Sequence, residues 1–276
     1  MKHDTQKWLY LILLPLIFHL NLYATGDMQA VGARQAGMGR TSVAMNDFWG
    51  LLNNQAGIAL FDRISVGISY ENRFSLKELS SKSVGLILPT RMGVLGLSYQ
   101  HHGFNLYNEQ KVGLVYARSF ADYLRIGLQL DYLQTTLGDN YGKKGSVTFE
   151  LGVQSDVNEQ LTIGVWAFNP IRVKLADYDS EKIQAIYRFG IKWKLSPQFV
   201  ATAEVEKNTS VKPVIARAGM EYAIKDRFFI RTGTSTKIEI FTLGVGFKSK
   251  FFVFDIAATM HESLGFSPQA SLLFQF

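Results

Sequence analysis

Few residues in the sequence are suited to catalysis or metal binding. His101 and His102 are adjacent, and they lie in an alternating segment where successive side chains point to opposite faces, so the two rings are poorly placed to bind one ion. His261 stands close to Ser263, yet no carboxylate lies at a spacing that would orient the imidazole for nucleophilic catalysis. We therefore predict no catalytic residue, no metal site and no cofactor.

The composition argues against several other functions. The 276 residues include no Cys, which rules out disulfides, thiolate metal sites and a lipid-modified cysteine anchor. The formal net charge is +6, but Lys and Arg are scattered, so we expect no nucleic-acid partner. Cations on the expected outer side suit the phosphates of lipopolysaccharide, although solubility explains them nearly as well. These cations are Lys77, Lys82, Lys143, Lys144, Arg172, Lys174, Lys207 and Lys237.

The segment of residues 25–62 is rich in Gly, Ala and Asn and does not alternate. Its glycine spacing superficially resembles a phosphate-binding loop, but no Lys-Ser or Lys-Thr follows and no strand precedes it. Its small residues permit close backbone packing, with Arg34 or Arg40 as candidates to pair with carboxylates such as Glu150 or Glu221. The alternative is a disordered linker, because glycine-rich segments lose much entropy on ordering.

From Ile64 onward, apolar and polar residues alternate with period two, which is typical of β-strands. In residues 124–132, for example, Leu, Ile and Tyr alternate with Arg, Gly, Gln and Asp. The pattern predicts about fourteen strands, separated by turn-like clusters. The predicted strands cover residues 64–73, 82–89, 93–103, 110–119, 122–135, 145–154, 160–168, 182–194, 197–206, 211–223, 226–233, 238–247, 250–260 and 268–276.

Strand number and length together favour an all-β fold, a transmembrane antiparallel β-barrel of about 14 strands. A soluble β-sandwich or a lipocalin-like barrel also alternates and is the alternative architecture. Tight turns alternate with longer polar connections, as in bacterial outer-membrane barrels. The polar face would then line the lumen. The lumen charges that we single out are Arg125, Asp131, Glu150, Arg188, Arg217 and Glu221.

Aromatic residues near the predicted strand ends suggest girdles at the lipid interface, with ordinary core packing as the alternative. These residues are Tyr70, Tyr99, Tyr132, Trp166, Tyr187, Trp193 and Tyr222. The last predicted strand places Phe274 and Phe276 on one face and ends on the aromatic residue. This ending resembles the signal read by the barrel-assembly machinery, which is therefore an expected partner, as is outer-membrane lipid.

Residues 1–24 have the features of a cleaved secretory signal peptide. Lys2 and Lys7 precede an apolar stretch, which is shorter than the ~20 residues that a spanning helix needs. The predicted organisation is a signal peptide over residues 1–24, an N-terminal segment over 25–62 and an outer-membrane barrel over 63–276. The expected location is the cell outer membrane.

The N-terminal segment contains a distinctive set of residues: Gly32, Arg34, Gly37, Met38, Gly39, Asp47, Asn54, Ala56 and Gly57. With this set, the segment resembles the start of the PorV/PorQ family of Bacteroidota outer-membrane proteins, itself similar to the FadL fatty-acid transporters. Gln55 stands where the family pattern has proline. The resemblance implies a fourteen-stranded barrel with this segment folded into the periplasmic mouth as a hatch.

Two functions follow from this resemblance. The PorV/PorQ likeness implies a type IX secretion accessory that handles secreted cargo or contacts other secretion components. The FadL likeness implies a transporter for small hydrophobic compounds. A mixed-charge lumen suits a plugged barrel better than an open pore, and we expect the secretion role with transport as the alternative.

Overall fold

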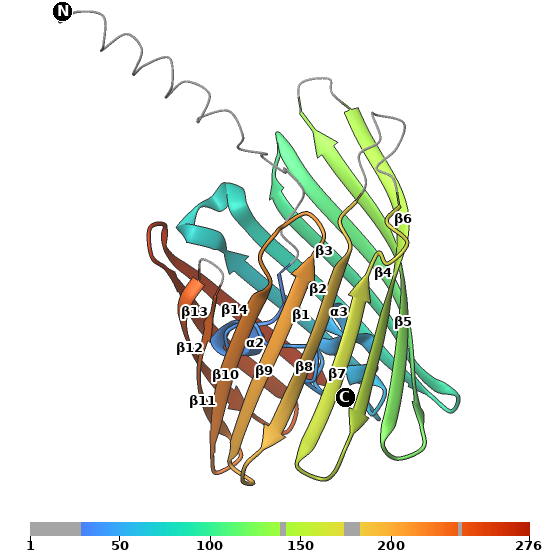
Figure 1. Ribbon diagram of the computed structural model, residues 1–276, viewed down its shortest axis with the longest axis vertical. Coiled ribbons are helices and arrows are strands. Elements are labelled where there is room, and N and C mark those ends of the chain that lie inside the picture. The colour runs from blue at the N-terminus through green and yellow to red at the C-terminus, as the bar shows by residue number, and fades with distance from the viewer. Residues whose placement is uncertain (1–28, 139–141, 174–182, 237–238) are drawn as a thin grey trace, which may run out of the picture.

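The computed structural model describes residues 29–138, 142–173, 183–236 and 239–276. The fourteen strands are antiparallel, each pairs with its neighbours in the sequence, and β1 pairs with β14 to close the barrel (Figure 1). The prediction of an all-β antiparallel barrel of about fourteen strands is therefore confirmed. The strands are β1 (Ser65–Asn72), β2 (Ser80–Thr90), β3 (Gly93–Phe104), β4 (Tyr107–Phe120), β5 (Leu124–Leu137), β6 (Gly142–Asp156), β7 (Leu161–Phe168), β8 (Ile186–Lys194), β9 (Phe199–Asn208), β10 (Ile215–Ile224), β11 (Phe228–Ser235), β12 (Glu239–Lys248), β13 (Phe252–His261) and β14 (Gly265–Gln275).

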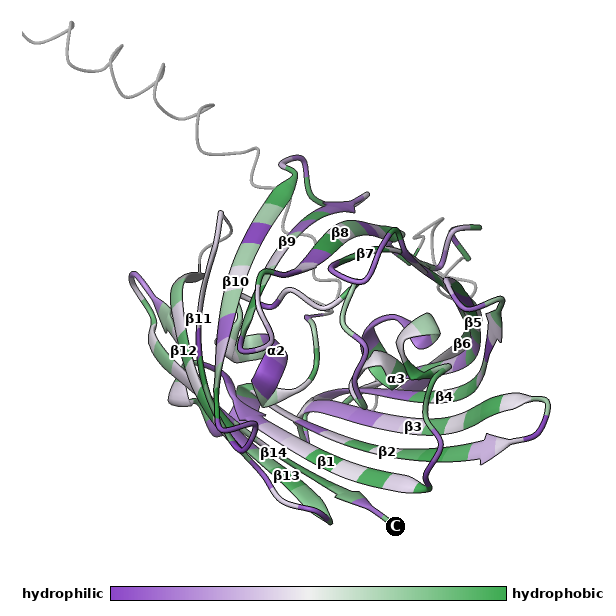
Figure 2. Ribbon diagram, turned by 90° about the horizontal axis from the view of Figure 1, so that it is seen from below, coloured by the Kyte–Doolittle hydropathy of each residue, from purple (hydrophilic) through white to green (hydrophobic). Residues whose placement is uncertain are grey.

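The alternating sequence produces two different surfaces. In β10, every second residue from Ile215 to Ala223 is buried, and the residues between them are exposed. The exposed positions include Met220 and Tyr222, whereas the buried ones include Arg217 and Glu221. The outer surface is thus apolar and the lumen carries the charge, the reverse of a soluble barrel. Figure 2 shows this alternation as stripes along the strands.

Closure at β1 and β14 leaves no sheet edge. Phe274 lies opposite Val66, and the Phe276 amide donates to the Ile64 carbonyl at 3.0 Å. The two chain segments that could form an edge therefore satisfy each other's backbone groups, which a lipid surrounding would leave unpaired at a cost of several kcal/mol each. Phe274 and Phe276 themselves are exposed on the outer side.

The barrel has two distinct ends. The short-turn end holds Ile64, the chain end and tight connections such as residues 91–92 and 225–227. The loop end holds the longer connections, including residues 73–79, with short 3₁₀ turns at Arg73–Ser75 and Lys77–Leu79. The described residues 169–173 and 183–185 also lie at this end.

The eighth strand is shorter than predicted, since it begins at Ile186 and not at residue 182. Ile183 and Ala185 belong to the predicted strand range but are buried ahead of the observed strand. The Ile183 amide donates to the Val173 carbonyl at 2.9 Å, and Asn169 Nδ2 donates to the Ile183 carbonyl at 2.9 Å. Local loop hydrogen bonds therefore replace the ladder that alternation predicted here.

Residues 29–62, hereafter the lumenal segment, lie inside the ring of strands (Figure 2). The segment contains α2 (Ala33–Gly37), α3 (Gly50–Asn53) and a 3₁₀ turn, η2 (Gln55–Ile58). Phe48, Leu51 and Ile58 pack against wall residues Ile87 and Val115 to form the main apolar core. The barrel therefore has its hydrophobic core within the lumen. No helix in the described part of the chain is long and apolar enough to cross a membrane.

Candidate functional site

The lumenal segment meets the barrel wall at a ring of inward-facing glycines. At each of these positions a Cβ atom would collide with, or press closely on, the segment; at Gly85 it would lie 2.5 Å from Leu51 Cδ2, and at Gly219 it would meet the backbone of Met38. The absence of side chains at these wall positions therefore makes room for the segment. This glycine ring consists of Gly67, Gly85, Gly96, Gly127, Gly152, Gly164, Gly190, Gly219, Gly233 and Gly244.

The helix α2 is anchored by ion pairs. Arg34 Nη2 lies 2.6 Å from Glu221 Oε1, and Arg34 Nη1 lies 3.0 Å from Asp47 Oδ2. Glu221 also accepts from Arg231 Nε at 2.6 Å, and Arg231 reaches Asp255 at 2.7 Å. Burial lowers the pKa of Arg34, but the carboxylates of Glu221 and Asp47 outweigh that effect and hold the pKa above its ordinary value. The wall and the segment thus share one charged network.

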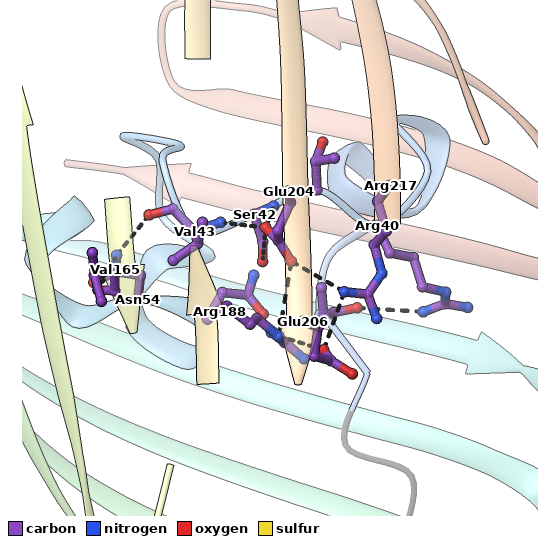
Figure 3. Close-up of polar contacts among 12 residues, drawn as sticks. Arg40, Ser42, Val43, Asn54, Val165, Arg188, Glu204, Glu206 and Arg217 are labelled. Atoms are coloured by element: carbon purple, nitrogen blue, oxygen red, sulfur yellow. Dashed lines mark hydrogen bonds and ion pairs between the residues drawn. The ribbon is translucent and has the colours of Figure 1, made fainter. Parts of the chain in front are cut away.

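A second network lies on β8, β9 and β10 (Figure 3). Glu204 Oε2 accepts the backbone amides of Ser42 and Val43 at 2.7 and 2.8 Å. Arg217 Nη1 lies 3.2 Å from Glu204 Oε1 and 3.1 Å from Glu206, and Arg188 Nε lies 2.7 Å from Glu206. A buried carboxylate here satisfies backbone donors that the irregular segment cannot pair internally.

Glu150 is the centre of a third network and is completely buried. It accepts hydrogen bonds from Gln55 Nε2 at 2.5 Å, Lys111 Nζ at 2.6 Å and Trp166 Nε1 at 3.0 Å. Neither Arg34 nor Arg40 is its partner, contrary to one of the pairings that we considered. Asp131, another of the lumen charges that we singled out, accepts a hydrogen bond from Gln129 Nε2 at 2.5 Å.

Asn54 and Gln55 fix the end of the lumenal segment. Asn54 Oδ1 accepts the Ala56 amide at 3.2 Å, and Asn54 Nδ2 donates to the Val43 carbonyl at 2.6 Å. Asn54 has an extended backbone, and Gln55 is the first residue of the 3₁₀ turn. Proline is well tolerated after an extended residue and at the start of a helical turn. The backbone at Gln55 would therefore also accept the proline of the PorV/PorQ pattern.

The other residues that we singled out occupy several places. Gly32 and Gly39 have positive φ values of 108° and 66° on either side of α2 and Met38, and Gly57 packs against Gln154. Arg125 pairs with Asp156 at the short-turn end at 2.7 Å, away from the segment. Arg40 pairs with Glu71 at 2.6 Å.

Trp166 does not belong to the expected lipid girdle. It is 2% exposed and faces the lumen, where Glu150 binds its indole N–H. The period-two pattern indicates this orientation, since Thr162, Gly164 and Phe168 on the same face of β7 are also buried. The other six aromatic residues of the predicted girdle are exposed on the outer surface.

A cavity of about 390 Å³ lies between the lumenal segment and the loop end. Leu52 of the segment borders it, as do apolar side chains such as Leu133, Trp166 and Phe168. Its volume is within the range of small-molecule sites, about 300–1,000 Å³. Sequence reasoning missed this site, because its walls come from strands and a loop that are distant in the chain.

The histidines have local structural roles. His102 Nδ1 lies 2.8 Å from Ser81 Oγ. His261 Nδ1 accepts the backbone amides of Ser263 and Leu264, both at 3.0 Å, and so shapes the turn between β13 and β14. Within the described residues, no group of three or more His, Asp or Glu side chains is placed to hold a metal ion.

Comparisons with known proteins identify the fold. No protein-family model and no curated protein matches the chain. Among solved structures, the Pseudomonas putida toluene transporter TodX aligns with a TM-score of 0.69 at 10% identity, over 91% of this chain and 99% of that chain. The CymD monoaromatic hydrocarbon channel aligns with a TM-score of 0.68 at 12% identity, over 90% and 98%. A Pseudomonas aeruginosa FadL homologue gives 0.60 at 11% identity, over 91% and 98%. The chain thus shares the barrel fold of these proteins.

Proposed function

We propose that the protein is an outer-membrane barrel that admits small hydrophobic compounds, with the lumenal segment as its hatch. The observation that carries this proposal is the cavity of about 390 Å³ between the segment and the loop end. A cavity inside a membrane barrel whose walls are partly apolar can hold a hydrophobic compound during its passage. The likeness to structures named as a toluene transporter and a hydrocarbon channel also supports transport of small hydrophobic compounds.

The apolar outer surface supports the membrane location. Leu114, Leu130 and Ile230 are each more than half exposed on the outward faces of their strands. Such a belt is stable only against lipid or another apolar surface. With an even strand number, both chain ends of a bacterial barrel lie on the periplasmic side, which would place the cavity on the extracellular side of the segment.

The hatch role rests on how tightly the segment is held. Charged networks and the glycine ring bind it to at least ten strands of the wall. Transport therefore requires the segment to shift or partly unfold, and we expect no large steady conductance from the resting protein in planar bilayers.

The secretion role implied by the PorV/PorQ resemblance stays a prediction. Its distinguishing outcome in a deletion strain is the loss of surface delivery of C-terminally tagged cargo. The transport role predicts instead that cargo delivery persists while uptake of an aromatic hydrocarbon falls.

Uptake of radiolabelled naphthalene by a deletion strain carrying matched variants tests the transport role. Leu133 lines the cavity, so Leu133→Trp should obstruct it and slow uptake severalfold. Leu130 lies on the same strand and faces outward, so Leu130→Trp is the control and should transport at the wild-type rate. Equal uptake by the deletion strain and by all complemented strains would refute the proposal.

A further inference from the structure

Cations gather on two neighbouring turns at the short-turn end of the barrel. The turn between β10 and β11 carries Lys225 and Arg227, and the turn between β12 and β13 carries Lys248 and Lys250, with Asp226 as the one acid. The Lys248 amide donates to the Arg227 carbonyl at 2.8 Å, so the two turns are in direct contact. All four cationic side chains are exposed, and within the described residues none of them forms an ion pair. Since hairpins two strands apart lie about 10 Å from each other, these cations form one cluster.

The turn between β10 and β11 is tight. Lys225 and Asp226 have φ values of 52° and 54°, and the Arg227 amide donates to the Ile224 carbonyl at 3.2 Å. Positive φ at both central residues gives the two-residue hairpin that matches the twist of the flanking strands. The turn therefore keeps its cations at the end of the barrel.

A band of phenylalanines lies next to these turns on the outer wall. Phe228 on β11 lies opposite Phe247 on β12, and Phe247 lies opposite Phe254 on β13. Phe252 on β13 lies opposite Phe274 on β14. The Phe247 ring centroid is 5.1 Å from that of Phe228 and 5.9 Å from that of Phe252. Because β11 to β14 are side by side (Figure 2), the rings form a continuous aromatic surface.

The opposite side of the short-turn end has a different charge. The turn of residues 121–123, between β4 and β5, carries Asp122 and no cation. The next turn at this end, residues 157–160, carries Glu159 and no cation. The cationic cluster is therefore specific to one side of the barrel.

The order of charge and aromatic surface matches that of a phospholipid. Aromatic girdles of barrels lie at the lipid interface, which places the phenylalanine band beside acyl chains and the turns beside headgroups. Lys and Arg near a membrane surface attract anionic headgroups, and their N–H groups bond strongly to phosphate oxygens. A zwitterionic headgroup would bring its own ammonium group to the same place. The cluster therefore favours a headgroup with a net negative charge.

We propose that the two cationic turns and the phenylalanine band beside them bind an anionic phospholipid in the leaflet at the short-turn end. The cations contact its phosphate, and an acyl chain packs along the phenylalanines. This inference rests on the membrane location and goes beyond the proposed transport function, so either can fail while the other stands.

Native mass spectrometry of the purified full-length protein, released from detergent with equimolar dioleoyl phosphatidylglycerol and dioleoyl phosphatidylcholine, tests this preference. The two lipids share their acyl chains and differ in net charge. We expect phosphatidylglycerol adducts to exceed phosphatidylcholine adducts about tenfold, since one or two cations acting on the net charge suffice for that factor. The triple variant Arg227→Gln, Lys248→Gln and Lys250→Gln should bind the two lipids about equally.

The matched control removes three exposed cations elsewhere at the same end. The variant Arg91→Gln, Arg118→Gln and Lys194→Gln has the same net charge as the first triple variant and should keep the wild-type preference. Loss of the preference in both variants would reduce it to net charge and overturn the inference.

Three further results would also overturn it. Equal adducts of both lipids on the wild-type protein would show that the aromatic band ignores the headgroup. Displacement of phosphatidylglycerol by excess inorganic phosphate would show a plain anion site to which the acyl chain adds nothing. Absence of either adduct would show that lipid does not occupy the patch. Naphthalene uptake by the first triple variant should stay at the wild-type rate, which separates this inference from the transport role.

Discussion

The lumen contains two levels that differ in what fills them. At the level of the lumenal segment, the wall residues are glycines, and large side chains such as Phe48 and Leu51 come from the segment. At the level of the cavity, the wall itself carries large side chains, including Trp166 and Phe168, and a void lies beside them. The wall is therefore complementary in shape to the lumenal segment at the first level, and it leaves a void at the level of the cavity.

The same contrast applies to charge. At the segment level, carboxylates such as Glu204 and Glu221 are saturated by the segment's backbone amides or by Arg34. At the cavity level, the ion pairs close among themselves and leave neutral polar side chains such as Ser83 and Gln100 without partners among the described residues. Polar groups in the lumen thus fall into two sets, one that holds the segment and one that faces the cavity without a partner.

The largest expected effect comes from Glu150, which joins the two levels. Glu150→Leu leaves Lys111 buried without its carboxylate, and breaking such a pair costs about 3–5 kcal/mol of unfolding free energy. Urea unfolding of the purified protein in lipid vesicles measures this loss. The double variant Glu150→Leu with Lys111→Met should recover most of it, and a single variant as stable as wild type would show that the network does not matter.

A smaller effect is expected at the glycine ring. Gly219→Ala places a methyl group against the Met38 backbone and should cost about 1–3 kcal/mol through overpacking. It should also speed proteolysis within residues 33–39, measured by limited digestion. Ala218→Val adds two methyl groups on the outward side of the same strand and serves as the control. Equal protection of both variants would mean that the wall is not matched to the segment.

The smallest effect is expected from Gln55→Pro, which introduces the proline of the PorV/PorQ pattern. The backbone at Asn54 and Gln55 accepts proline, so only the side-chain bonds to Gln129 and Glu150 are lost. We expect a loss of about 2 kcal/mol of unfolding free energy, because two hydrogen bonds with a net value of about 1 kcal/mol each are lost. A loss as large as that of Glu150→Leu would indicate that the backbone itself is strained by proline.

Alternation alone was sufficient to predict the number of strands, because a barrel with an apolar outer face and a polar inner face imposes period two on every strand. It failed at Ile183, where side-chain and backbone bonds of Asn169 hold a loop that has a strand-like sequence. The prediction for Trp166 was wrong because it relied on the residue being aromatic. The alternation places Trp166 on the same inward face of the strand as Gly164 and Phe168. An overlooked signal was an inward-facing glycine in strand after strand, which marks the level of the segment.

The pairings and the cavity could not be predicted from the sequence. Arg34 and Glu221 are 187 residues apart, and their contact depends on the position of α2 across the lumen. The cavity depends on strands from two arcs of the barrel and on Leu52 of the segment. Such features depend on how the barrel closes and how its strands tilt, and the alternation within a single strand does not determine either.

The central claim is that the lumenal segment separates the cavity from the short-turn end. The chain has no native Cys, so single cysteines can be introduced at Thr135, which lines the cavity, and at Lys192, on the short-turn side of Gly190. A membrane-impermeant maleimide is then added to intact cells. The account predicts rapid labelling of Thr135→Cys and none of Lys192→Cys; equal labelling of both would contradict it.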